Sequence, residues 1–366
     1  MDTFVNGSLL ILGNGFDVNC GLKSSFESFF GKSHDQNLWY KIFNFVFSKA
    51  EEPFANPIFE VYKKTNILWM DVESCIKNVL FMNSTSNFEK GRLKRIFGFD
   101  SYISILQLAF NQRFNSIYLY DNYQFCEFKR FFMSRFDNNI NSIDIVDYLS
   151  DELIRFEEEF KTYIARISQT DEYKKKSAKI LGELIDDGEE AFDILTFNYT
   201  IPDQNAVSFF AYNNINHVHG IMNDKVIIGY DSSDISEIND NRIKMSKAIQ
   251  KMFYKTSNVA LPEKDQVLFL KFYGHSLSSQ DYSYFHSIFD YYEIYHNGKI
   301  SLVFYYTPYH DTKEENDKWR NEYIGQVYNL LNSYSLNSSI HNEKSNVIVS
   351  KLLLENRLFI RKIPKL

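Results

Sequence analysis

The chain has 366 residues, a formal net charge of −7 and 44% hydrophobic residues, enough for the core of one large domain or two smaller ones. The negative charge argues against a protein that coats nucleic acid, and no apolar stretch is long enough to cross a bilayer. The three cysteines, Cys20, Cys75 and Cys126, form no CxxC pair, which excludes a thiolate zinc ribbon and suits a reducing compartment. The first apolar run follows no basic region, so it is not a signal peptide, and we expect a cytoplasmic protein.

The segment 9–12 is a run of four apolar residues and predicts a short buried strand. Gly13 and Gly15 then flank Asn14, a pattern typical of a tight turn whose backbone N–H groups can hold phosphates. A strand–helix turn that binds nothing has the same pattern. Val18 replaces the third glycine of a dinucleotide fingerprint, and no Gly-Lys-Ser/Thr follows, so a nucleotide would bind here in another mode.

The region 24–187 is predicted to be almost wholly helical. Ser24 and Glu27 fit a capping box at the start of a short helix. The strongest helical periodicity is that of 145–168, where the acidic run 157–159 lies mostly off the apolar face and is expected in solvent. Further helices are predicted at 38–48, 101–112, 123–135 and 173–186, and from Trp69, Asp71 and Glu73 to about residue 82, where the two acids suit the helix N-terminus.

The remainder of the chain alternates short apolar runs with helical segments. Strands are predicted at 193–197, 225–229, 266–272 and 299–306, helices around 241–254, from Asp281 and at 314–334, and edge strands in 344–366. This alternation indicates an α/β fold with a mostly parallel, Rossmann-like sheet. We expect residues 1–23 and 188–366 to form a nucleotide-binding-like core, with 24–187 as a large helical insertion after the first strand.

Polar residues stand where the predicted strands end: Gly13-Asn14-Gly15, Asn198-Tyr199-Thr200, Gly274-His275-Ser276 and Thr307. In an open parallel sheet the carboxyl ends of the strands form the ligand crevice. We therefore expect Gly15, Asn198 and Ser276 from these ends to line one cleft together with His219.

Each of these side chains also has a simpler interpretation. The Asn198 amide can orient a sugar hydroxyl or a water, or can merely occupy a turn. His217 and His219 could hold a metal or divide into one structural and one catalytic histidine, and no third ligand stands at a telling spacing. His275 and Ser276 are candidates for a binding site or for helix caps, and Asp281 suits a helix N-terminus.

Five short motifs, in this order, resemble the bacteriophage abortive-infection AbiH family: Gly13-Asn14-Gly15-Phe16-Asp17, Trp69-x-Asp71-x-Glu73, Phe197-Asn198-Tyr199-Thr200, His217-Val218-His219-Gly220, and Gly274-His275-Ser276-Leu277 with Asp281. The agreement runs along nearly the whole chain. The resemblance implies a bacterial, cytoplasmic antiphage protein.

The same motifs are more distantly similar to sirtuin-like NAD-cleaving domains of phage defence. That resemblance implies a sirtuin-like sheet with Asn198 and His219 as the catalytic pair and His217 beside them. It also implies nucleotide contacts from Gly13, Asn14, Gly15, Phe16 and Asp17, and from Gly274, His275, Ser276 and Asp281. The chain departs from the pattern at Asn14, Phe16 and Asp17 in the glycine turn and at Thr200, where an aspartate is usual, and it has no zinc-module cysteines.

Three functions compete on this evidence. The first is hydrolysis of the N-glycosidic bond of NAD, with NAD as substrate, no permanently bound cofactor and no metal. The second is a module that senses a nucleotide signal for a partner protein or within a homo-oligomer. The third is a metal-dependent nuclease or other phosphodiester hydrolase using His217 and His219.

Overall fold

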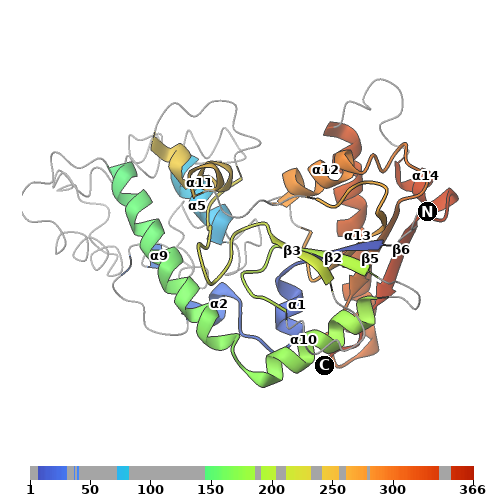
Figure 1. Cartoon of the computed structure of the whole chain (residues 1–366), viewed down its shortest axis with the longest axis horizontal. Helices are drawn as coiled ribbons and strands as arrows, with labels where there is room; N and C mark the ends of the chain where they lie inside the picture. Colours follow the sequence, from blue (N-terminus) through green and yellow to red (C-terminus); the bar gives the residue numbers. More distant parts are fainter. Residues whose placement is uncertain are drawn as a thin grey trace, which may run out of the picture. The chain divides into compact units, whose positions relative to one another are not determined.

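The computed structural model describes residues 7–30, 37, 39–40, 72–81, 145–185, 191–202, 212–231, 241–254, 261–277, 281–337 and 348–366 (Figure 1). The described part of the chain is α/β and contains one six-stranded sheet in the order β3-β2-β1-β4-β5-β6, with every neighbouring pair parallel. The strands are β1 (Gly7–Leu12), β2 (Ala191–Thr196), β3 (Tyr212–His217), β4 (Val267–Tyr273), β5 (Ser301–Tyr306) and β6 (Leu358–Lys362).

The two faces of the sheet are covered by different helices, because successive residues of a strand point to opposite sides. Leu10 and Leu12 of β1 pack with α1 (Asn14–Asn19) and α10 (Asp171–Leu184). Leu9 and Ile11 pack with α12 (Tyr282–Tyr291), α13 (Lys313–Asn337) and α14 (Ile348–Leu354). Burial on both faces explains why these strands are continuously apolar.

The helices change side between β1 and β4. Helices α1 and α10 lie in the connection from β1 to β2, whereas α12, α13 and α14 lie in the connections from β4 through β5 to β6 (Figure 1). The strand order is that of the doubly wound Rossmann-like fold, and its switch point lies between the carboxyl ends of β1 and β4. The predicted α/β fold with a mostly parallel sheet is thus confirmed.

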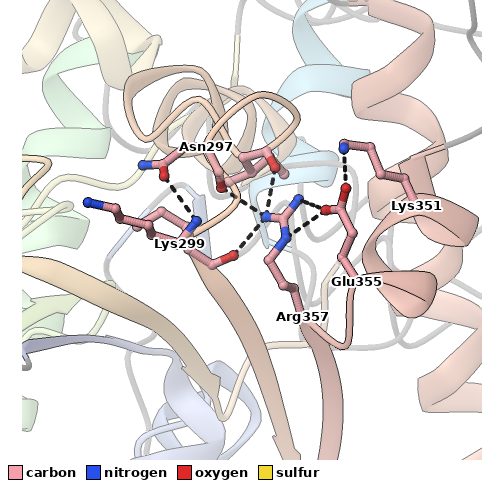
Figure 2. A network of polar contacts seen from close by, with 7 residues as sticks. Asn297, Lys299, Lys351, Glu355 and Arg357 are labelled. Atoms are coloured by element: carbon pink, nitrogen blue, oxygen red, sulfur yellow. Dashed lines mark hydrogen bonds and ion pairs between the residues drawn. The ribbon is translucent and has the colours of Figure 1, made fainter.

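The far end of the sheet is fixed by Arg357, which is buried just before β6 (Figure 2). Its Nη1 donates to the carbonyls of Ile294, Asn297 and Ile300 at distances of 2.8–3.1 Å, and its Nε donates to Glu355 at 2.8 Å. One guanidinium therefore satisfies the buried carbonyls of the α12–β5 connection and ties that connection to the turn before the last strand.

Some predicted elements differ from the structure. The sequence does not predict the edge strand β3, because its residues, Tyr-Asn-Asn-Ile-Asn-His, carry little apolar signal. The predicted strand 225–229 is buried and contributes only an isolated bridge between Val226 and Gly220. The tail contains the predicted edge strand β6, but α14 precedes it. The Ser24 hydroxyl donates to Asn14 Oδ1 at 2.5 Å, and the capping box of Ser24 with Glu27 stays a prediction.

The chain divides into two compact units, and the sheet lies in the first: Met1–Ser25, Lys161–Val226 and Lys255–Leu366. The second unit comprises Phe26–Phe160 and Ile227–Tyr254. The expected core of 1–23 and 188–366 with an insertion at 24–187 stays a prediction. Among the described residues no helix is long and apolar enough to cross a membrane.

The described part of the second unit contains α2 (Phe26–Phe30), α5 (Val72–Phe81), the first two-thirds of α9 (Ile145–Ile167), η3 (Asn241–Met245) and α11 (Lys247–Tyr254). The predicted helices at 145–168, 173–186 and 314–334 are confirmed as α9, α10 and α13. The predicted helices at 101–112 and 123–135 lie outside the described residues, as do Trp69 and Asp71.

Two acidic side chains have roles in the second unit that the sequence does not predict. Glu157 is 1% exposed, against the expectation of a solvated acidic run, and its Oε1 accepts the backbone N–H of Ile228 at 2.8 Å. Glu73 lies in the first turn of α5, and its Oε2 is 2.5 Å from Nζ of the buried Lys247. Glu73 thus compensates a buried charge in addition to any interaction with the helix dipole.

Candidate functional site

The glycine turn after β1 packs directly on the loop after β4. A Cβ atom at Gly13 would lie 2.7 Å from the carbonyl oxygen of Gly274, and one at Gly15 would lie 2.8 Å from the Cα of Gly274. Gly274 has a φ of +78°, and its own Cβ would fall on the backbone of Phe16. The three glycines therefore allow two loops to touch at the switch point of the sheet.

Backbone hydrogen bonds within this contact use most of the turn's N–H groups. Gly13 donates to the carbonyl of Tyr273 at 2.9 Å, Gly15 to that of Gly274 at 2.7 Å, and Phe16 to that of Gly13 at 2.9 Å. These donors are the groups that would hold a pyrophosphate in a dinucleotide-binding turn. Any phosphate bound here would have to meet other donors or a rearranged loop.

Phe16 and Asp17 point into the interior of the first unit. The Phe16 ring is fully buried and lies edge-on to Tyr273, with 6.4 Å between ring centroids. The Asp17 carboxylate is 1% exposed and accepts hydrogen bonds from Tyr173 at 2.7 Å and from the Thr200 hydroxyl at 2.9 Å. Burial raises the pKa of Asp17 to about 7, although both hydrogen bonds oppose that rise. The structure thus uses both residues to anchor the turn.

Asn198 follows β2 and is held from both sides. Its Nδ2 donates to the carbonyl of Gly13 at 3.0 Å, and its backbone N–H donates to the Thr196 hydroxyl at 3.0 Å. The side chain is 5% exposed. Because Nδ2 is committed to Gly13, the amide is fixed, and Oδ1 is the atom of this side chain that could accept a hydrogen bond from a ligand.

His217 ends β3 and contacts the Asn198 backbone. Its Nδ1 lies 3.0 Å from the carbonyl oxygen of Asn198. Since a carbonyl only accepts, Nδ1 carries the proton, and the neutral ring then has an unprotonated Nε2. That Nε2 is buried and has no hydrogen-bond partner among the described residues. Burial lowers the pKa of His217 and keeps its imidazole neutral at pH 7.

His219 lies in the turn after β3, and its Nε2 is 3.5 Å from Oδ1 of Asp281. The imidazole is held edge-on by the rings of Phe197, at 5.3 Å between centroids, and Tyr284, at 5.4 Å. The side chain of His219 is 6% exposed and that of Asp281 is 22% exposed. The Asp281 carboxylate therefore lies on the more open side of the histidine.

The loop after β4 contributes His275 and Ser276. His275 packs edge-on against Phe197 and Phe285, and burial lowers its pKa to about 4. Its imidazole is therefore neutral at physiological pH and serves the contact with Gly13. Ser276 is exposed, and within the described part of the chain no hydrogen bond joins it to the other candidates. Asn14 is also exposed at this edge.

The structure brings together the turns after four adjacent strands, β3, β2, β1 and β4, through direct contacts. His217 contacts Asn198, Asn198 contacts Gly13, and Gly13 contacts the loop of His275. No group of three or more metal-ligating side chains occurs among the described residues. The sequence motifs identify Asp281 and His219 separately. They do not predict the contact between them, because 61 residues separate the two along the chain.

The fold and this polar group define an open, doubly wound α/β protein with candidate site residues beside its switch point. The sequence matches the family model described as bacteriophage abortive infection AbiH over residues 9–306, so the chain belongs to this family. The match confirms the resemblance drawn from the five motifs. Membership connects the chain with abortive infection, a defence against bacteriophage. No curated protein and no solved structure matches the chain at a significant level.

Proposed function

We propose that the chain is an antiphage effector that hydrolyses the bond between nicotinamide and ribose in NAD, depleting NAD in infected cells. The observation that carries the proposal is the fixed group of Asn198, His217 and His219 at the carboxyl edge of a Rossmann-like sheet. Ligands of such sheets bind at this edge, next to the switch point.

The proposed reaction breaks the bond between C1′ and the pyridinium nitrogen. The bonding electrons go to the ring, so nicotinamide leaves as a neutral molecule and needs no general acid. A water attacks C1′ and loses a proton to His219, giving ADP-ribose. The transition state resembles an oxocarbenium ion, as in glycoside hydrolysis. The fixed Oδ1 of Asn198 orients the water or a ribose hydroxyl by accepting its hydrogen.

The burial of the histidines fits this division of roles. His217 is neutral, and its proton is committed to the Asn198 carbonyl, so it supports the position of Asn198. His219 faces the partly exposed carboxylate of Asp281 with its Nε2 and is therefore the better placed base. A water-poor site of this kind also suits a reaction in which one ordered water is the nucleophile.

The direct test is nicotinamide release from NAD by the purified full chain, and NAD content in phage-infected cells that express it. His219→Ala and Asn198→Ala should each lower the rate about a hundredfold or more, because a positioned base contributes at least that much. His296→Ala and Asn321→Ala are matched controls, since both residues are exposed on the same unit, and both variants should keep the wild-type rate.

The infected-cell arm decides between the candidate functions. If NAD stays level while protection still requires His219, the group senses a nucleotide signal and the hydrolysis proposal is wrong. Cleavage of a phosphodiester substrate by the purified chain, lost on chelator treatment and restored by a divalent metal, would instead support the phosphodiester hydrolase. The glycohydrolase is supported if cells expressing the wild type or the His296→Ala variant lose NAD during infection, whereas cells expressing His219→Ala keep it.

A further inference from the structure

Asp281 stands at the N-cap position of α12 but makes no side-chain capping hydrogen bond there. Aspartate is among the best N-cap residues because its carboxylate can accept the N–H groups of the first helical turn. Here the carboxylate is directed instead to His219, whose Nε2 is 3.5 Å from Oδ1. The residue therefore serves a contact outside its own helix.

We propose that Asp281 is a positioning residue for His219, which it orients and whose protonated form it stabilises; this rests on the proposed role of His219 as the base. The rings of Phe197 and Tyr284 lie edge-on to the imidazole, and Asp281 stands at the N-cap position of α12, so both partners belong to packed parts of the first unit.

The distance of 3.5 Å between Nε2 and Oδ1 is longer than an ordinary N–H···O hydrogen bond and leaves room for the contact to shorten. When Nε2 takes the proton of the attacking water, the new N–H faces the carboxylate, and a neutral histidine becomes a cation beside an anion. Contacts of this kind are often long before the substrate binds and tighten in the reacting complex. Because the carboxylate is only 22% exposed, solvent screens the attraction incompletely.

Three other titratable side chains of the described residues lie around the pair: His275, His217 and Tyr284. His275 in the β4 loop is neutral near pH 7, and Asp281 acts on it electrostatically as well. His217 is buried and neutral, and the phenol of Tyr284 lies on α12 next to the imidazole. Because the Asp281 carboxylate contacts the His219 imidazole, removing its charge should lower the pKa of His219.

The test measures the pKa of His219 directly, with no need for turnover. The full chain carries ¹³C-labelled histidine, and the His219 resonance is assigned by its absence in a His219→Gln variant. Asp281→Asn keeps the size of the side chain and removes its charge, so the pKa of His219 should fall by about one unit or more. Asp265→Asn, at an exposed position on the same unit, should leave it unchanged.

The same substitution has a second readout if the chain turns over NAD. The acidic limb of the pH profile of kcat/KM should move to lower pH by the same amount, with a fall in kcat about tenfold and little change in KM. A His219 resonance with the wild-type pKa in folded Asp281→Asn protein would overturn the inference. That result is independent of hydrolysis, so the failure of one proposal does not imply the failure of the other.

Discussion

The buried carboxylate of Asp17 provides a quantitative test of how the glycine turn is held. The pKa of Asp17 rises from 3.8 to about 7 in the folded protein, mainly because burial disfavours the charged form. The folded state therefore binds more protons than the unfolded state between these values, and this residue's contribution to stability falls as pH rises from 4 to 7. At about 1.36 kcal/mol per pKa unit, ionisation costs the fold about 4 kcal/mol at pH 8.

The substitution Asp17→Asn replaces the carboxylate by a neutral group of the same shape. At pH 5 the variant should be about 1 kcal/mol less stable than the wild type, because the hydroxyls of Tyr173 and Thr200 must rotate to accept from the new amide. At pH 8 it should be about 2 kcal/mol more stable, because the penalty for the buried charge in the wild type grows by roughly 2.6 kcal/mol between pH 5 and pH 8. The difference in unfolding free energy between the two proteins should thus change sign with pH.

The measurement is urea unfolding followed by circular dichroism at pH 5, 6, 7 and 8. The difference in unfolding free energy between variant and wild type is compared across these pH values, because the titration of other groups contributes equally to both proteins and cancels. His275, for example, acts in the opposite direction, because its depressed pKa makes the fold lose stability as pH falls from 6.5 to 4. The exposed Asp311→Asn serves as the control and should show no trend. A stability difference for Asp17→Asn that does not vary with pH would refute the reasoning.

Two further predictions concern packing. Gly274→Ala should destabilise the first unit by about 3 kcal/mol or more, because its φ of +78° is strained for alanine and the new methyl group meets the glycine turn; Gly298→Ala, which has open space, should change stability by less than about 0.5 kcal/mol in the same thermal melt. Lys247→Met should destabilise the second unit by about 3 kcal/mol, since it removes the ammonium that pairs with Glu73, and adding Glu73→Gln should recover part of this loss. Additive effects of the last two substitutions in urea unfolding would contradict the ion-pair assignment.

The sequence by itself determines the strands of the sheet's centre and their polar ends. Leu9–Leu12 and the strands β2, β4 and β5 are largely buried on both faces, so each carries a mainly apolar run that can be recognised from the sequence, with Asp193 in β2 and Lys271 in β4 as charged exceptions. The long helices α9, α10 and α13 can likewise be predicted from the spacing of their apolar residues and from the residues at their ends. By contrast, the edge strand β3 is formed from polar residues and owes its existence to pairing with β2.

Only the tertiary structure decides what the candidate residues do. Gly13, Gly15 and Gly274 have the same sequence signature whether a turn holds a phosphate or another loop, and the contact distances show the second use. A buried carboxylate such as Asp17 and a partly exposed one such as Asp281 are chemically identical in a sequence. Their environments, set by residues remote along the chain, give one a structural role in the fold and bring the other beside a histidine.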